Sequence, residues 1–529
     1  MNCRKITGFR RIKEGYADYL EDESKLDAGS TRASGRIEAL YLPKTTEEVQ
    51  EAASELFSCG IPYCVSGGRT GITGGAVPEG CGALISLEGL KRAPELRYDE
   101  ARACWTITLG AGWKLKSLQE MLTRGISNAG GKAAGSAGQG GKLVLPKLFF
   151  PVDPTETSAA IGGMAATNAS GARTLFYGPT RDWVLGLEAV LANGSRMRAH
   201  RGEGALGEGK NITLSCGGRT ITVPSLDPPV TKHAGGYWLK ADAELIDLFI
   251  GSEGTLGMIT ELELRLVEPP DETLYLCLFP ESDEPVDLVR ALKNCAGFKP
   301  LALEYMDAKS LALLRDYRDL QHEASGVPDI PEQTAAVLYT EIGFSGEQAF
   351  REIKEELYSV FHEHGLRPDA TWAGFSPGTL RAMKNFRHAL PERINAVLGG
   401  RRRSIPGLTK IGTDMAVPDA ALREMLRIYR SSLDARGLEY CIFGHIGNGH
   451  LHVNILPESR EELEQGRELY KDFARRAASF GGSVSAEHGL GRLKREYLAL
   501  QFGEEGREIM KKVKQLFDPK GLLNPGVLL

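Results

Sequence analysis

The sequence of 529 residues lacks the features typical of membrane-spanning, secreted and nucleic-acid-binding proteins. No apolar run reaches the roughly 18 residues needed to cross a bilayer, and residues 1–23 alternate charged and apolar side chains. We therefore expect neither a membrane-spanning helix nor a signal peptide. The 64 Lys and Arg residues do not outnumber the 69 Asp and Glu residues, and no basic block occurs. The chain thus lacks the electrostatic pattern of a nucleic-acid-binding protein.

The nine cysteines are odd in number, widely spaced and without a C-x-x-C pair. This pattern argues against a disulfide framework and against an iron–sulfur cluster held within the chain. Buried reduced thiols in a cytoplasmic protein are the simpler interpretation. We therefore expect a cytoplasmic location, and a peripheral contact at the inner face of a membrane stays open.

Glycine, in contrast, is abundant, with 63 residues or about 12% of the chain against a typical value of about 7%. It is dense from residue 36 to about residue 268, where short strand and helix patterns alternate. The stretch EEVQEAASELFSCG (47–60) follows an N-cap threonine at Thr45 or Thr46 and is closed by Gly60, which predicts an amphipathic helix. The low-complexity stretch 130–142 predicts a flexible loop.

Pro269-Pro270 marks a boundary, because consecutive prolines end regular structure. Beyond it longer helical patterns alternate with short strands, which indicates a second α+β unit. The stretch 195–236 predicts an insertion with two strands. We predict four parts, namely an N-terminal helical segment (1–35), a first domain (36–268), a second domain (269–485) and a C-terminal segment (486–529).

The first glycine-rich loop spans residues 66–75, SGGRTGITGG, directly after a predicted strand. Its five glycines within nine residues let the backbone approach an anion and turn its N–H groups inward as a phosphate nest. The loop is not a P-loop, and it lacks G-x-G-x-x-G, which excludes a standard nicotinamide-binding site. A glycine-rich surface turn is the alternative.

Two further stretches of small residues follow. The first combines PVDPT (151–155) with IGGMAATNASG (161–171), and it leaves room for a flat, bulky group that Thr167 and Asn168 can hydrogen-bond. Tight packing without a cofactor is the alternative. The second, IGSEGTLGMIT (250–260), is a glycine-spaced turn that leads into an alternating strand pattern.

Three of the ten histidines lie within eight residues, in FGHIGNGHLHVN (443–454). His450 and His452 share one face if the stretch is a strand. Clustered imidazoles suit a borderline divalent metal such as zinc, and hydrogen-bonded core histidines are the alternative. The neighbouring residues Glu487 and His488 offer a carboxylate as a further ligand and an imidazole as a base.

The three loops, in this order, resemble the FAD-binding domain of the vanillyl-alcohol-oxidase / p-cresol-methylhydroxylase superfamily. The C-terminal half resembles its branch of FAD-linked D-2-hydroxyacid dehydrogenases, which includes D-lactate dehydrogenase, the glycolate oxidase flavin subunit and D-2-hydroxyglutarate dehydrogenase. The resemblance implies an α+β fold, with a two-subdomain FAD-binding domain, an α+β substrate (cap) domain and a C-terminal helical return. FAD would lie between the subdomains with its pyrophosphate on the 66–75 loop, and it would be non-covalent because this loop has no histidine. The implied FAD-binding residues are Ser66, Gly67, Gly68, Arg69, Thr70, Gly71, Gly74, Asp153, Pro154, Thr155, Gly162, Gly163, Thr167, Asn168, Gly171, Glu253, Gly257, Ile259 and Asn524.

The same branch holds a divalent metal through the outer histidines of H-x₆-H and the glutamate of E-H-G. The resemblance therefore implies His445, His452 and Glu487 as metal ligands, with zinc favoured, and His488 as the base. His450 stands where some members carry Asn, which leaves open which two of the three histidines bind the metal. The resemblance also implies that three further residues contact the substrate, with the carboxylate held by the first: Arg387, Lys410 and Asn454.

The expected reaction is the FAD-dependent oxidation of a D-2-hydroxyacid to the 2-oxoacid, with hydride passing to flavin N5 and the proton to the histidine base. D-Lactate is the favoured substrate, and D-2-hydroxyglutarate or glycolate are alternatives. The electron acceptor would be separate: an iron–sulfur protein, an electron-transferring flavoprotein, a quinone or a cytochrome. A homodimer stays open. The rival interpretations are a non-redox alkyl-dihydroxyacetone-phosphate synthase and a non-enzymatic flavin-binding subunit.

Overall fold

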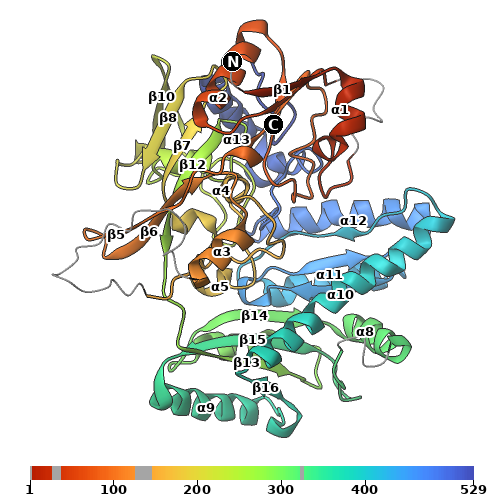
Figure 1. The fold of residues 1–529 in the computed structure, drawn as a ribbon. Coiled ribbons are helices and arrows are strands. Elements are labelled where there is room, and N and C mark those ends of the chain that lie inside the picture. Colours follow the sequence, from red (N-terminus) through yellow and green to blue (C-terminus); the bar gives the residue numbers. More distant parts are fainter. Residues whose placement is uncertain (1–2, 27–36, 125–145, 322–326) are drawn as a thin grey trace.

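The computed structural model describes residues 3–26, 37–124, 146–321 and 327–529 (Figure 1). The predicted flexible loop at 130–142 lies outside the described residues. The described residues build two larger sheets and one small sheet in the N-terminal half and a seven-stranded sheet in the C-terminal half, with helices on their faces (Figure 1). The predicted α+β class is confirmed.

The first sheet has four strands in the order β1-β2-β4-β3. β2, β4 and β3 run parallel, and α2 follows β2. Thr45 caps α2 by accepting a hydrogen bond from the N–H of Glu48, and Gly60 ends it in the left-handed conformation, as predicted. The bounds are β1 (Arg4–Thr7), β2 (Ala39–Leu42), β3 (Tyr63–Ser66), β4 (Ala83–Ser86), α1 (Phe9–Gly15) and α2 (Thr46–Cys59).

The N-terminal segment is helical only in part, which corrects one expectation. Residues 4–7 form β1 and pair antiparallel with β2, so the segment adds a strand to the first sheet. Pairing with β2 buries Ile6, and α1 then places Ile12 in the same buried cluster. Burying such side chains contributes about 1.5–3 kcal/mol each. The segment therefore forms a strand, although its four residues, two of them charged, carry only a weak strand signal.

The second sheet is antiparallel, with five strands in the order β5-β6-β12-β7-β8. The stretch 195–236 contains more strands than predicted, because its start forms β8 of this sheet and its remainder forms a small sheet of β11-β10-β9. The bounds are β5 (Glu95–Asp99), β6 (Cys104–Gly110), β7 (Val184–Val190), β8 (Arg196–His200), β9 (Gly207–Glu208), β10 (Asn211–Cys216), β11 (Arg219–Pro224), β12 (Met258–Leu266), α3 (Leu115–Arg124), α4 (Ile161–Ala166), α5 (Thr174–Tyr177) and α6 (Leu245–Phe249).

The third sheet has seven strands in the order β16-β13-β15-β14-β18-β19-β17. β18 and β19 form an antiparallel hairpin whose connection carries the histidine motif. The bounds are β13 (Glu272–Leu278), β14 (Pro300–Met306), β15 (Val337–Phe344), β16 (Trp372–Gly374), β17 (Ile411–Gly412), β18 (Tyr440–Gly444), β19 (His452–Ile455), α7 (Val286–Asn294), α8 (Ala308–Gln321), α9 (Gly346–Glu363), α10 (Pro377–Ser404), α11 (Leu422–Asp434), α12 (Arg460–Ser479) and α13 (Tyr497–Phe517).

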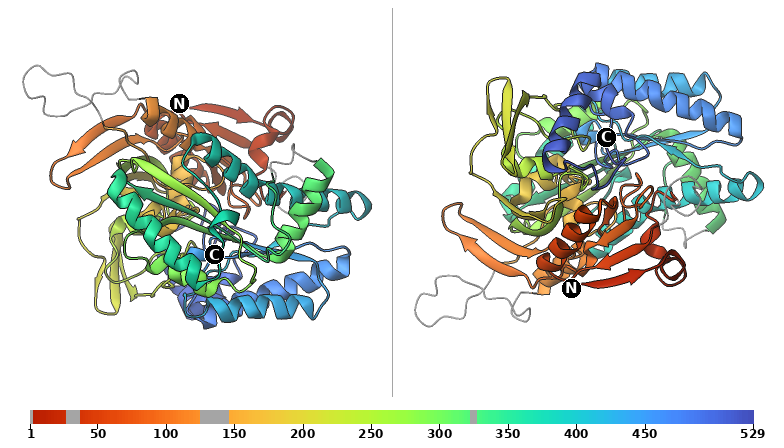
Figure 2. Two further views of the ribbon diagram at one scale, coloured as in Figure 1. Left: turned by 90° about the horizontal axis from the view of Figure 1, so that it is seen from below. Right: turned by 90° about the horizontal axis from the view of Figure 1, so that it is seen from above.

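The C-terminal segment returns to the first sheet. The N–H of Tyr63 in β3 donates to the carbonyl of Leu522, and the N–H of Asn524 donates to the carbonyl of Tyr63. Leu528 is fully buried, and the C-terminus lies within the outline of the molecule in both views of Figure 2. The predicted C-terminal return is therefore present.

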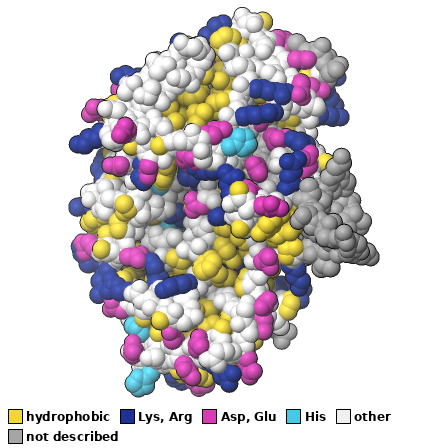
Figure 3. All heavy atoms as spheres, turned by 90° about the vertical axis from the view of Figure 1, so that its left-hand side faces the viewer, with side chains coloured by type: hydrophobic (Ala, Val, Ile, Leu, Met, Phe, Trp, Pro, Cys, Tyr) yellow, Lys and Arg dark blue, Asp and Glu magenta, His cyan; other side chains and the backbone are white. Residues whose placement is uncertain are grey.

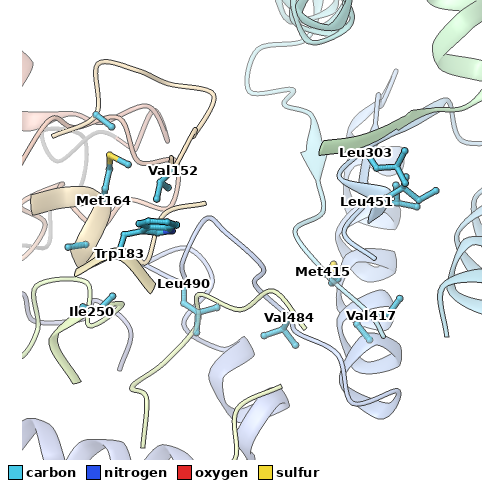
Figure 4. Packing of buried hydrophobic residues seen from close by; sticks show 14 of the residues in the cluster. Val152, Met164, Trp183, Ile250, Leu303, Met415, Val417, Leu451, Val484 and Leu490 are labelled. Carbon is cyan, nitrogen blue, oxygen red and sulfur yellow. The ribbon is translucent and has the colours of Figure 1, made fainter. Parts of the chain in front are cut away.

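One continuous apolar core joins the two halves. Figure 4 shows Met164 and Trp183 on one side, Leu303 and Leu451 on the other, and Leu490 between them. Leu490 belongs to the segment before α13, so the chain that returns from the third sheet fills the space between the halves. This packing holds residues 485–491 close to the 66–75 loop, the 250–260 loop and the β18–β19 hairpin.

The surface shows charges of both signs. On the face in Figure 3, basic and acidic side chains are interspersed, with apolar atoms in the hollows between them. Within the described ranges, no helix has the length and apolarity required to cross a bilayer. All nine cysteines are free thiols, as expected from their spacing.

Candidate functional site

A cavity of about 330 Å³ lies where the three small-residue loops meet the C-terminal segment. This volume falls within the range of small-molecule sites, roughly 300–1,000 Å³. Glu487 and His488 also line it, so the cavity reaches the histidine cluster. The predicted FAD-binding residues that line it are Gly67, Gly68, Arg69, Thr70, Gly71, Pro154, Thr155, Gly162, Gly163, Thr167, Glu253, Gly257, Ile259 and Asn524.

Five predicted FAD-binding residues do not line the cavity: Ser66, Gly74, Asp153, Asn168 and Gly171. The Asn168 side chain instead donates to the carbonyl of His233 and accepts from the N–H of Arg181. Asp153 accepts from the N–H of Arg173. Both side chains therefore use their polar atoms on backbone groups, and they shape the loops rather than face the cavity.

The loops around the cavity contain residues in a rare backbone conformation. Arg69, Asn168, Glu253 and Asn524 have φ of +58°, +48°, +53° and +46°. Non-glycine residues in this region cost energy and cluster at ligand sites, where surrounding contacts hold them in place. For Glu253 these contacts are the N–H groups of Leu490 and Gly491, which donate to its carboxylate at 2.8 and 2.7 Å.

The cavity walls fit a large flat cofactor. A Cβ atom added at Gly163, which lines the cavity, meets no other atom within 4 Å. The neighbouring loop is closely packed, since a Cβ at Gly68 would lie 3.0 Å from the nitrogen of Ala160. Among the described lining residues, His488 is the one histidine and there is no cysteine. The cavity therefore combines open space, exposed backbone and few nucleophilic side chains.

The β18–β19 hairpin and the returning segment bring the predicted metal ligands together. His445 follows β18, His452 begins β19, and Glu487 lies in the segment before α13. Glu487 Oε2 lies 3.3 Å from His445 Nε2, and Glu487 Oε1 lies 3.2 Å from His452 Nε2. His450 also faces the cluster, with Nδ1 at 3.9 Å from Glu487 Oε2. One donor atom from each of these four residues lies within 4.8 Å of the others.

The connection between β18 and β19 requires glycine at position 449. Gly449 adopts φ of +62°, and a Cβ there would lie 2.0 Å from the carbonyl oxygen of Val417. Glycine is therefore required for both conformation and space. This close approach sets the positions of His450 and His452, which follow directly.

Each ring in the cluster has a partner on the side away from Glu487. His445 Nδ1 lies 2.6 Å from Glu304 Oε1, and His452 Nδ1 lies 3.0 Å from the carbonyl of Thr413. Burial lowers the pKa of His450 well below its ordinary value, so its imidazole is neutral. Burial opposes ionisation of Glu487, but Lys232 and His445 hold its pKa well below the usual range. Burial favours the neutral form of His445, but the neighbouring Glu304 raises its pKa above the ordinary value. A carboxylate among imidazoles is a donor set for a divalent metal.

His488 lies between the cavity and the cluster. Its Nδ1 is 3.3 Å from Asp414 Oδ1, its Nε2 is 3.4 Å from Glu487 Oε1, and about a quarter of its side chain is exposed. Asp414 is fully buried, and its carboxylate accepts from the N–H groups of Glu487 and His488 and from the hydroxyl of Ser485. Asp414 thus anchors the whole Glu487-His488 pair.

The predicted substrate residues lie in different environments. Arg387 on α10 places Nε 3.4 Å from Glu304 Oε2, beside the cluster of histidines and Glu487. Asn454 on β19 is buried two residues after His452. Lys410 is exposed just before β17, and no carboxylate in the described residues lies within ion-pairing distance of it.

Two charged residues of the cluster were not predicted from the sequence. Lys232 is almost fully buried, and its Nζ lies 2.5 Å from Glu487 Oε2. It falls in the insertion, where no pattern marks it. Glu304 pairs with both His445 and Arg387. A glutamate within the apolar strand PLALEYM (300–306) is the signal that could have revealed it, because buried charges require partners.

Two regions of the chain match known families. Residues 268–528 match the family described as "FAD linked oxidases, C-terminal domain", and residues 142–200 match one described as "FAD binding domain". A D-lactate dehydrogenase of Archaeoglobus fulgidus is 30% identical over 490 residues, covering 92% of this chain and 89% of that protein. A D-2-hydroxyglutarate dehydrogenase of Xanthomonas citri pv. viticola is 28% identical, covering 93% of this chain and 89% of that protein.

The fold also matches a solved structure. Alkyldihydroxyacetonephosphate synthase superimposes with a TM-score of 0.58 at 16% identity, covering 93% of this chain and 77% of that one. At this level of identity the match shows a shared fold.

Proposed function

This chain belongs to the FAD-linked oxidases, and we propose that it oxidises a D-2-hydroxyacid to the 2-oxoacid, with D-lactate as the favoured substrate. D-2-Hydroxyglutarate and glycolate are the alternative substrates. One observation carries the proposal, namely that Glu487 and His488 line the cavity formed by the three small-residue loops and also belong to the histidine cluster. A redox cofactor and a substrate-activating site would therefore share one wall.

The cavity residues would hold FAD without a covalent link. The 66–75 loop offers its backbone N–H groups to the pyrophosphate, and small residues such as Gly163 leave space for the ring system. FAD, when bound, supplies the two-electron acceptor for the oxidation. Acid precipitation should release the flavin into the supernatant, whereas flavin that stays with the protein pellet would contradict a non-covalent link.

The cluster would hold a divalent metal, with zinc favoured. Its imidazole and carboxylate donors match the preferences of that ion, and the ligand set inferred from the resemblance is His445, His452 and Glu487. The metal, when bound, would polarise the hydroxyl oxygen of the substrate as a Lewis acid. The outer partners, Glu304 for His445 and the carbonyl of Thr413 for His452, orient the rings toward Glu487.

Buried charges around the cluster favour an anionic substrate. Three carboxylates face three cationic groups, namely Glu304, Asp414 and Glu487 against Lys232, Arg387 and Lys494. These charges balance, so a divalent ion would leave the pocket positive, which a 2-hydroxycarboxylate offsets. Arg387 would bind the substrate carboxylate through its planar guanidinium, and Lys232 is a second candidate for this role. Asn454 and the exposed Lys410 would contact the remainder of the substrate.

His488 would accept the proton of the substrate hydroxyl. Its contact with Asp414 Oδ1 through Nδ1 leaves Nε2 on the side of Glu487, where the ring can exchange a proton. Imidazole suits this role because its ordinary pKa lies near neutral pH. The buried Asp414, with Oδ1 at 3.3 Å from Nδ1, would orient the ring as the carboxylate partner of a catalytic histidine does in general.

The electron acceptor, the location and the assembly are part of the proposal. The acceptor would be a separate iron–sulfur protein, electron-transferring flavoprotein, quinone or cytochrome. The nine free thiols support a cytoplasmic site, with a peripheral membrane contact or a homodimer as further options.

The deciding experiment is a panel of D-2-hydroxyacids with the purified FAD-loaded chain and an artificial electron acceptor. D-Lactate should bleach the flavin absorbance in a stopped-flow instrument and support turnover, and L-lactate serves as the matched control. Bleaching by no member of the panel would contradict the proposal and favour a non-redox flavoenzyme. Turnover with D-2-hydroxyglutarate or glycolate alone would retain the reaction class and replace the substrate.

A further inference from the structure

We propose that His450 is a third imidazole ligand of the metal, so that this chain holds a centre of three histidines and one glutamate. The inference rests on the proposed function in taking the cluster as a metal site. It goes further by assigning a ligand at a position where the sequence resemblance expects none.

The first argument is the environment of the His450 side chain. The ring is fully buried, and neither Nδ1 nor Nε2 has a hydrogen-bond partner in the part of the chain that the structure describes. Its Nδ1 lies 3.9 Å from Glu487 Oε2, on the side of the other donors. A buried polar nitrogen without a partner is costly, and coordination of an ion would satisfy it.

The second argument is the common orientation of the three rings. His445 and His452 each direct one nitrogen to an outer acceptor, Glu304 or the carbonyl of Thr413, and the other nitrogen to Glu487. His450 has the same layout without the outer hydrogen bond, since its Nε2 lies 3.3 Å from Asp414 Oδ1 but does not bond to it. Metal-binding histidines characteristically have an outer partner, which fixes the nitrogen that carries the proton. Asp414 is the carboxylate placed for that role beside Nε2, with Nδ1 on the side of Glu487.

The third argument is the spacing of the donor atoms. Two ligands bound to zinc at about 2.0–2.1 Å in a tetrahedron lie about 3.3–3.4 Å apart. With Glu487 Oε2 as the ligand oxygen, His445 Nε2 at 3.3 Å matches this spacing, and His450 Nδ1 at 3.9 Å needs a small inward movement of its ring. His452 Nε2 lies 3.2 Å from the other oxygen, Oε1, and one donor atom from each of the four residues lies within 4.8 Å of the others.

The ammonium of Lys232 strengthens the case for a further neutral ligand. It lies 2.5 Å from Glu487 Oε2, so this oxygen is shared between Lys232 and the metal position. A divalent ion bound here would receive less negative charge from Glu487 than it would if Lys232 were absent. A third imidazole adds a donor without adding charge, which fits a pocket whose carboxylates already have partners.

The proposal predicts a preference among metals. Three imidazoles favour zinc and other late transition ions, whereas manganese and magnesium prefer oxygen donors. With four protein ligands, substrate binding would require a fifth position, as zinc sites can adopt during catalysis. Replacing His450 by the Asn of some relatives should therefore weaken zinc binding far more than manganese binding.

The test measures metal binding to the full-length FAD-loaded protein after chelation, by competition with a chromogenic chelator. His450→Asn should lose at least about 10–100-fold in Zn²⁺ affinity, the range seen even when only outer partners are changed, and less than about 3-fold in Mn²⁺ affinity. His452→Asn is the positive control, and His200→Asn, about half exposed on β8, is the surface control. A crystal structure of the zinc-loaded wild type should place His450 Nδ1 about 2.0–2.2 Å from the ion.

The outcomes separate this inference from the proposed function. Zinc bound by His445, His452 and Glu487, with His450 outside coordination distance, would overturn it while leaving D-lactate oxidation intact. Unchanged Zn²⁺ affinity in His450→Asn, alongside a large loss in His452→Asn, would do the same. If neither variant changes Zn²⁺ affinity, the cluster is not the metal site, and the metal part of the proposed function fails as well. Should His450→Asn not fold, the wild-type crystal structure decides the question alone.

Discussion

Replacing Asp414 by Asn removes the charge that anchors the Glu487-His488 pair and keeps the side-chain shape. Asp414 is fully buried, and its carboxylate accepts three hydrogen bonds, at 2.8 Å from the Ser485 hydroxyl, 3.2 Å from the N–H of Glu487 and 3.1 Å from the N–H of His488. Burial alone opposes its ionisation, but His488 and Lys494 hold its pKa below the usual range. The carboxylate is therefore charged at neutral pH.

The expected loss of stability follows from these contacts. Breaking a buried charge pair by removing one partner costs about 3–5 kcal/mol. The NH₂ group of Asn is itself a donor, so it cannot accept the hydrogen bonds that the Asp414 carboxylate accepts. Each donor that is left unpaired costs about 1–3 kcal/mol. We expect Asp414→Asn to lower the free energy of unfolding by at least about 3 kcal/mol, a large share of the 5–15 kcal/mol typical of a folded domain.

The expected loss of activity has a separate cause. Without Asp414, His488 loses the partner that orients its ring and favours one position of its proton. We expect kcat per bound FAD to fall by about 10²–10⁴-fold, the usual contribution of a positioned base. Because Asp414 is absent from the cavity lining, the ratio of flavin to protein absorbance should stay unchanged.

Urea unfolding and steady-state kinetics on the best D-2-hydroxyacid test both parts. Asp419→Asn is the matched control, because its exposed carboxylate pairs with Lys293 at the surface and should contribute less than about 1 kcal/mol. Wild-type stability in Asp414→Asn would refute the structural argument. Reduced stability with unchanged kcat per bound FAD would refute the assignment of Asp414 as the partner that orients the base.

Three further predictions concern the substrate, the cofactor and pH. Arg387→Ala should mainly raise KM, because it removes a carboxylate contact worth about 2–4 kcal/mol in ground state and transition state alike, whereas His488→Ala should lower kcat and kcat/KM together by about 10²–10⁴-fold. Steady-state kinetics separates the two, and wild-type turnover in His488→Ala would disprove the assigned mechanism. Gly163→Leu should abolish FAD binding with little loss of apoprotein stability, since a side chain there meets no atom within 4 Å of its Cβ; flavin absorbance and thermal unfolding measure this, and full FAD content would contradict it. Burial raises the pKa of Glu253 to about 7 from 4.5, so the folded protein binds this proton more tightly and should lose up to about 3 kcal/mol of stability as pH rises through that interval. Urea unfolding at pH 5 and pH 8 should show that fall in the wild type and not in Glu253→Gln, and equal pH slopes would contradict the interpretation.

Local patterns in the sequence were sufficient for much of the fold and for the motifs. The helix between Thr45 and Gly60 and the alternating strand of β12 follow from capping residues and period. The C-terminal return at Asn524 was inferred from the family resemblance. The strand β1 escaped this reasoning, because residues 4–7 carry a weak signal and become a strand by pairing with β2. Asn168 was expected to contact the cofactor, yet its φ of +48° and its two backbone partners turn its side chain away from the cavity.

The sequence by itself determined which donor types are available, since three histidines within eight residues and an adjacent Glu-His pair indicate a metal site wherever they meet. Only the tertiary structure decided their partners. Glu304 reaches His445 across 141 residues, and Lys232 reaches Glu487 across 255. Such contacts depend on how the chain returns between distant strands, and no local period or spacing encodes that path. The tertiary structure also placed Asp414 Oδ1 3.3 Å from Nε2 of the buried His450 ring and Glu487 on the side of its Nδ1, because the groups packed around a buried imidazole come from distant segments of the chain.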